Sequence, residues 1–68
     1  MFSLKTIGGA CQRVRYKAYL TQKEVAEKTN YSVSTISAFE NGRLNNASLL
    51  AYYIEIGLTR EDLVQYDK

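Results

Sequence analysis

Apolar side chains recur every three or four residues along most of the chain. At the N-terminal end, the positions that follow this spacing are Leu4, Ile7, Cys11, Val14 and Ala18. The spacing predicts an amphipathic helix over residues 4–18. Gly8 and Gly9 fall within this helix, and each weakens it by up to about 1 kcal/mol relative to alanine. Glycines on a helix surface also allow another backbone to approach closely.

A second helix begins with a clear start signal. Thr21 and Glu24 form the capping-box pattern, in which the hydroxyl and the carboxylate each bind a free amide at the helix start. The predicted helix covers residues 22–29 and buries Val25 and Ala26.

A third helix follows after a short connection. Ser32 is a suitable N-cap for a helix over residues 33–41, because its hydroxyl can accept a hydrogen bond from an unpaired amide. Ile36 and Phe39 would form its buried side, and Gly42 is a typical C-terminal stop.

Two more helices are predicted in the C-terminal third. Asn45 or Asn46 caps the fourth helix, which Gly57 ends; its inward positions are Leu49, Leu50, Tyr53 and Ile56. The segment Thr59-Arg60-Glu61-Asp62 opens a short fifth helix, with Leu63 and Tyr66 turned inward. The pattern therefore predicts an all-α fold, a compact five-helix bundle in one domain over residues 1–68.

Residues 22–41 have the layout of a helix-turn-helix motif, two short helices joined by a three- to four-residue turn. Ala26 lies where the helices would cross, and Asn30 suits a turn position with positive φ. The side chains expected to point into the shared core are Val25, Tyr31, Ile36 and Phe39. The second helix of such a motif can lie in the major groove of DNA.

Composition excludes several classes of protein. Cys11 is the only cysteine and there is no histidine, so an intrachain disulfide and the usual zinc ligand sets are excluded, and we expect no cofactor. We expect Cys11 to be a buried apolar residue.

No nucleophile–base set or phosphate-cradling glycine loop is present, so we expect no enzyme. Without a signal-peptide pattern or an apolar run of about 18 residues, we expect a cytoplasmic protein with no membrane partner.

Charge is distributed unevenly along the chain. Residues 1–46 carry a net charge of +4, whereas residues 47–68 carry −2. The N-terminal two-thirds would therefore be the part that approaches a polyanion, although an ordinary solvated surface gives a similar distribution.

The chain resembles the Cro and phage-repressor type of helix-turn-helix proteins, the XRE family. The residues that carry the resemblance are "LTQKEVA" (20–26), "SVSTISAFENG" (32–42) and "GLTREDL" (57–63), with Ile7-Gly8 and Arg15 upstream. The resemblance implies a lambda-repressor-like fold and a small DNA-binding transcriptional regulator, such as a Cro-like repressor. A one-domain regulator of this type would suit a phage or another mobile element.

The resemblance also implies roles for individual residues. Arg15 and Glu40 match an ion pair between the first and third helices, the alternative being two unconnected surface charges. The positions that match base-contacting residues are Val33, Ser34, Ser37 and Ala38. The residues expected to contact DNA phosphates are Gln22, Lys23, Thr35, Arg43, Asn45 and Arg13.

Three features of the chain depart from this pattern. The loop "GRLNNA" between the third and fourth helices is shorter than is common in the family and has no proline. None of the four base-contacting positions has the Arg, Gln or Asn side chains that normally distinguish bases, so recognition would rely on methyl contacts, bridging water and DNA shape. We therefore expect a homodimer on a two-fold operator. Tyr19 stands where relatives often have glycine, which implies either a strained backbone or a different helix ending.

The high tyrosine content leaves a second class of function open. Six of the 68 residues are tyrosine, a residue enriched in protein interfaces. The alternative is a protein-binding modulator or antirepressor, which would use the helix-turn-helix scaffold to bind another regulator.

Overall fold

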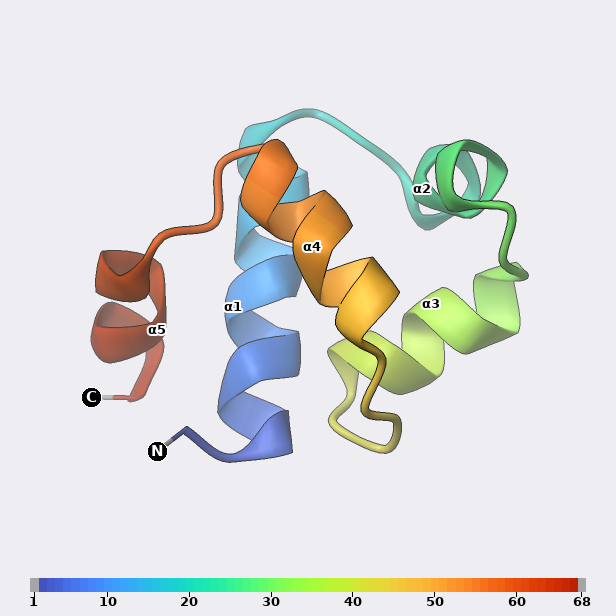
Figure 1. The fold of residues 1–68 in the computed structure, drawn as a ribbon. Coiled ribbons are helices and arrows are strands. Elements are labelled where there is room, and N and C mark those ends of the chain that lie inside the picture. Colours follow the sequence, from blue (N-terminus) through green and yellow to red (C-terminus); the bar gives the residue numbers. More distant parts are fainter. Residues whose placement is uncertain (1, 68) are drawn as a thin grey trace.

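The computed structural model describes residues 2–67, which form five α-helices and no strand. The helices are α1 (Leu4–Lys17), α2 (Gln22–Thr29), α3 (Val33–Glu40), α4 (Ala47–Glu55) and α5 (Arg60–Asp67). α1 lies in the middle of the molecule, between α5 on one side and α3 and α4 on the other (Figure 1). This arrangement confirms the predicted all-α five-helix fold, and α1 and α3 each end one residue earlier than the sequence suggested.

Side chains cap the helix starts as the sequence predicts. At α2, the Thr21 hydroxyl accepts from the Glu24 amide at 3.1 Å, and the Glu24 carboxylate accepts from the Thr21 amide at 2.9 Å. The backbone hydrogen bond from Thr21 is also the main reason that the pKa of Glu24 is lowered. Ser32 caps α3. Of the two candidates for α4, Asn46 rather than Asn45 is the N-cap.

Two non-glycine residues have a left-handed backbone conformation, and both end a helix segment. Asn30 has φ 64°, as expected for the turn between α2 and α3. Tyr19, just after α1, has φ 59° and a side chain that is 93% exposed. The chain thus adopts the strained conformation at Tyr19. This conformation lets the Leu20 amide donate to the Arg15 carbonyl oxygen at 3.1 Å and the Tyr19 amide to the Tyr16 carbonyl oxygen at 3.0 Å, as in a Schellman ending.

One apolar core takes its buried side chains from every helix except α5, whose Leu63 packs against it half-buried. Its buried members are Ala10, Cys11, Val14, Val25, Ala26, Ile36, Phe39, Leu49, Tyr53 and Leu58. The Phe39 and Tyr53 rings stack with centroids 5.6 Å apart. Cys11 is fully buried, as predicted, and burial raises the pKa of its thiol to about 12.

The prediction that Tyr31 points into this core is wrong. Its side chain is 37% exposed, whereas Val25, Ile36 and Phe39 are at most 3% exposed. Tyr31 lies in the turn between α2 and α3, so it is not on the buried face of either helix.

The two glycines in α1 allow close contacts on different sides of the helix. A Cβ atom on Gly8 would lie 2.6 Å from the Glu40 carbonyl oxygen, so the backbones of α1 and α3 touch here. A Cβ atom on Gly9 would meet the Tyr66 ring instead. The expected close approach of another backbone is confirmed at Gly8, and Gly9 makes room for α5.

Candidate nucleic-acid interface

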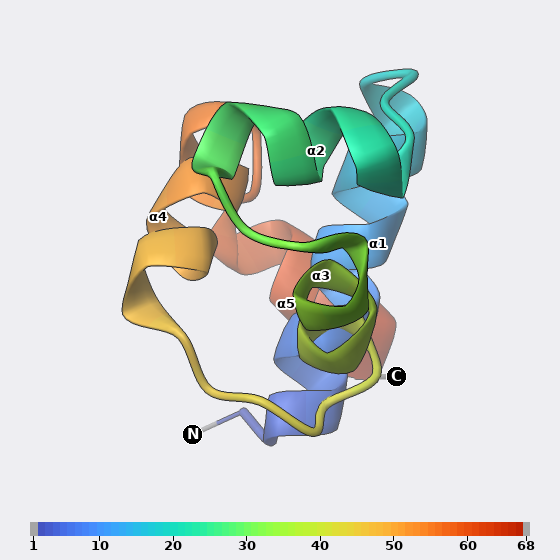
Figure 2. The same cartoon turned by 90° about the vertical axis from the view of Figure 1, so that its right-hand side faces the viewer.

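Helix α3 has a buried face and an exposed face. Ile36, Phe39 and Glu40 are buried against the rest of the protein. In Figure 1, α3 extends away from α1 towards the edge of the molecule, and in Figure 2 it is seen nearly end-on with its N-terminal end nearest the viewer. The start of α3 therefore projects from the protein, which is the end of the helix that approaches base edges in helix-turn-helix proteins.

The four predicted base-contacting residues lie together on this helix. Val33 is 44% exposed and Ser34 is also exposed, while Ser37 and Ala38 are half-buried one turn further along. All four side chains are short, so the backbone of α3 would have to come close to the base edges. Such a surface offers methyl groups and hydroxyls, without long donors or acceptors.

Thr35 lies beside the N-cap of α3. Its hydroxyl is 2.9 Å from the Ser32 hydroxyl, and its amide donates to the same Ser32 oxygen at 3.1 Å. Because the first amides of a helix attract anions, this end of α3 is a suitable place for a phosphate.

Glu40 is the centre of a buried polar cluster, which we call the Glu40 cluster: Arg15, Gln22, Glu40 and Tyr53. The Arg15 guanidinium donates to Glu40 through Nε at 2.7 Å and through Nη2 at 3.0 Å. The Tyr53 hydroxyl donates to Glu40 Oε2 at 2.5 Å, and Gln22 Nε2 donates to Oε1 at 3.2 Å. The structure thus brings Arg15 and Glu40 together as the ion pair that the sequence suggested.

The Glu40 cluster fixes four helices in register, because Arg15 is on α1, Gln22 on α2, Glu40 on α3 and Tyr53 on α4. The hydrogen bond to Glu40 is the largest cause of the raised pKa of Arg15, and burial followed by the bond to Glu40 raises the pKa of Tyr53. Arginine therefore stays charged and tyrosine neutral. A buried pair of this kind specifies the arrangement of helices more than it stabilises the fold.

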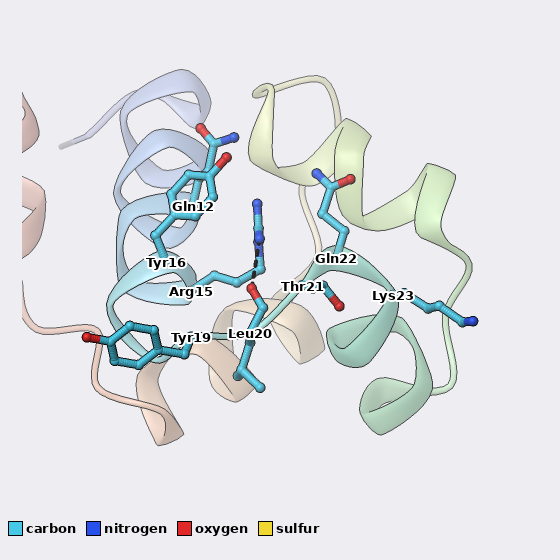
Figure 3. A pocket seen from close by; sticks show the side chains of 8 residues that line it. All are labelled: Gln12, Arg15, Tyr16, Tyr19, Leu20, Thr21, Gln22 and Lys23. Atoms are coloured by element: carbon cyan, nitrogen blue, oxygen red, sulfur yellow. Dashed lines mark hydrogen bonds between the residues drawn. The ribbon is translucent and has the colours of Figure 1, made fainter.

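The start of α2 places two predicted phosphate-contacting residues near α3. Figure 3 shows the Gln22 side chain directed towards the space between α1 and α3, and the Lys23 side chain directed away from it. Lys23 is exposed, whereas Gln22 is half-buried because its amide nitrogen binds Glu40. Gln22 therefore joins the candidate interface to the Glu40 cluster.

The other predicted phosphate-contacting residues fall into two groups. Arg43 and Asn45 are exposed in the loop that follows α3, next to the candidate interface. Arg13 is not brought to this surface. Its guanidinium lies 5.1 Å from the centroid of the Tyr66 ring, on the side of α1 that faces α5. The attraction between the cation and the ring face holds it there.

Asn41 was missed by the sequence analysis as a candidate site residue. It directly follows α3, is exposed, and its side-chain amide binds Ser37. The signal was present in the spacing, because residue 41 is four positions after Ser37 and seven after Ser34. Residues at these separations lie on one face of a helix.

A sequence profile of the helix-turn-helix family, of the Cro and XRE type, matches residues 12–52. The chain belongs to this family. The match includes all of α2 and α3 and both members of the ion pair, and it identifies a DNA-binding transcription regulator. No curated protein and no solved structure matches the chain. Within residues 2–67, no helix has the length and apolar character needed to cross a membrane.

Proposed function

We propose that this helix-turn-helix protein is a Cro-like repressor that binds a two-fold operator as a homodimer, with α3 in the major groove. The observation that carries the proposal is the exposed face of α3, which projects from the protein while the opposite face is fixed by the core and the Glu40 cluster. Val33 and Ala38 would contact thymine methyls, and Ser34 and Ser37 would bind polar base edges.

Contacts to the DNA backbone would position the helix. Gln22 and Lys23 start α2, Thr35 lies in the first turn of α3, and Arg43 and Asn45 follow it. Phosphate contacts of this kind fix the register on the duplex without selecting a sequence. Arg13 is left out of this set because its guanidinium lies over the Tyr66 ring.

A surface groove between α4 and α5 supports the homodimer. It is lined by Phe2, Leu50, Ile54, Leu58, Thr59, Arg60 and Leu63. Ile54 is 55% exposed and lies beside other apolar side chains of this groove, and a contiguous exposed apolar patch is typical of a protein interface. The rim carries both signs of charge, with Arg60 in the lining and Glu61 next to it. A second copy of this surface would therefore offer apolar contacts in the centre and opposite charges at the edge. To occupy both halves of a two-fold operator, the two α3 helices of the dimer would have to lie about 34 Å apart on the DNA.

The decisive experiment is a mobility-shift assay with a site selected from random duplexes. We expect a retarded band. The affinity of the protein for the duplex should fall on the order of 100-fold when the salt concentration is raised fourfold, because Lys23 and Arg43 give four cationic contacts per dimer. Ser34→Ala combined with Ala38→Glu should abolish the band, since the new carboxylate would face phosphates and base acceptors. Gln65→Glu is the matched control, because it adds the same charge on α5, away from α3. This variant should bind the selected duplex as tightly as the wild type.

The assay also distinguishes the alternative function. Tyr16 is 61% exposed and Tyr19 is 93% exposed, and both line an open groove beside the start of α2 (Figure 3). Exposed tyrosines suit a protein partner. If the protein gives no band with any selected duplex but co-purifies with another regulator, the antirepressor function replaces the repressor.

A further inference from the structure

Asn41 extends the exposed face of α3 by one residue beyond the end of the helix. It lies one helical turn after Ser37, and it is the C-cap residue of α3. It is also the first amide side chain on the face that contains Ser34 and Ser37. The residue type that the base-contacting positions lack is therefore present immediately after them.

The hydrogen bonds of Asn41 determine which of its atoms remain available. Its Nδ2 donates to the Ser37 carbonyl oxygen at 2.9 Å and to the Ser37 hydroxyl oxygen at 3.3 Å. Only the amide nitrogen can donate to a carbonyl, so the orientation of the amide is fixed. Among residues 2–67 no group donates to Asn41 Oδ1, which is therefore available to accept a hydrogen bond from a ligand.

The same contact decides the role of the Ser37 hydroxyl. Ser37 Oγ accepts from Asn41, and within residues 2–67 it donates no hydrogen bond. Its hydrogen is therefore available for an acceptor outside the protein. Together the two side chains present one donor, Ser37 Oγ–H, and one acceptor, Asn41 Oδ1.

We propose that Ser37 and Asn41 act as one unit that recognises adenine in the major groove. Adenine presents an acceptor at N7 and a donor at N6, which complement the Ser37 hydroxyl and Asn41 Oδ1. Guanine presents acceptors at both N7 and O6, so Oδ1 would face a second acceptor. The pair thus offers the donor and acceptor of a single Asn or Gln side chain, divided between two residues. This inference rests on the proposed DNA binding and adds a specificity to it.

A phosphate contact by Asn41 is the competing explanation. A phosphate accepts hydrogen bonds and would need the Nδ2 group, which is already bound to Ser37. The two explanations differ in what a mutation does. Loss of a base contact relaxes preference at one base pair, whereas loss of a phosphate contact weakens binding equally for all sequences.

The test compares the sites selected by the wild-type protein and by single variants from random duplexes. The wild type should enrich adenine at one position of each half-site, and Ser37→Ala and Asn41→Ala should both lose preference at that position. The expected loss is about 5- to 150-fold in the ratio of affinities for adenine and guanine. Asn45→Ala serves as the matched amide control and should lower affinity for both duplexes by the same factor.

A modified base tests the donor directly. Replacing that adenine with 7-deazaadenine removes the N7 acceptor, so it should weaken the wild type but have no further effect on Ser37→Ala. Circular dichroism melting of each variant shows whether α3 is still folded.

Three outcomes would overturn the inference. Uniform weakening by Asn41→Ala with base preference retained would make Asn41 a phosphate contact. Enrichment of another base at the position lost in both variants would exclude adenine. If the wild type enriches no sequence at all, the proposed function fails together with this inference.

Discussion

The two faces of α3 differ in the role of their side chains: those of the inner face hold the fold together, and those of the outer face are available to a ligand. On the inner face, Ile36, Phe39 and Glu40 are between 0% and 4% exposed, and Glu40 binds side chains from three other helices. On the outer face, Val33 and Ser34 are exposed. The inner face is constrained by shape and by complementary donors, whereas the outer face makes little contribution to the fold. Stability and DNA binding should therefore respond to different substitutions only a few positions apart.

The largest loss of stability is expected for Glu40→Ala. Removing the carboxylate leaves the Arg15 guanidinium buried without a counter-charge, which costs about 3–5 kcal/mol. The free energy of unfolding of a domain of this size is about 5–10 kcal/mol, so a large fraction of the variant should be unfolded. Urea unfolding followed by circular dichroism measures the loss.

A triple variant provides the control for this prediction. Arg15→Met with Glu40→Leu removes both charges at similar side-chain volume, and Tyr53→Phe removes the buried hydroxyl that would otherwise lose its acceptor. This variant should recover most of the lost stability. A loss below about 1 kcal/mol for Glu40→Ala alone would show that the inner face is not fixed by this cluster.

A smaller effect is expected from the glycines of α1. Gly8→Ala should destabilise by about 1–3 kcal/mol, because its new methyl group would collide with backbone atoms at the end of α3. Gly9→Ala is the matched variant and should cost less, since the Tyr66 side chain that it meets can rotate away. Thermal unfolding should resolve the difference, with about 4–8 °C per kcal/mol. Equal losses would contradict the special role of the α1–α3 contact.

The smallest effect on stability is expected on the outer face. Ser34→Ala should change the free energy of unfolding by less than about 0.5 kcal/mol, because the side chain is exposed. The same change should weaken binding to the selected operator, which titration of labelled duplex would measure. A variant that loses stability but binds DNA normally would reverse the assignment of the two faces.

Most of the fold could be predicted from local signals in the sequence. Thr21 with Glu24, Ser32 and Asn30 each act on residues within four positions, and the structure has them in the predicted roles. Tyr31 was placed wrongly because it lies in the turn between α2 and α3, where helical spacing does not show which way a side chain points.

The candidate site was less predictable, because it depends on contacts between distant residues. The sequence could not show that Arg13 lies over Tyr66, 53 positions further along, or that Gln22 binds Glu40. Asn41 was overlooked for a different reason. It was treated as the end of a helix, although its spacing from Ser34 and Ser37 places it on the same face.

The contact at Gly8 has a mechanical consequence for any bound duplex. Because main chain touches main chain there, no flexible side chain can yield and let α3 slide along α1. We therefore expect α3 to enter the major groove as a rigid body, without moving relative to α1. Any misfit in groove width would be taken up by bending or twisting of the DNA, so easily deformed sequences between the half-sites would be favoured.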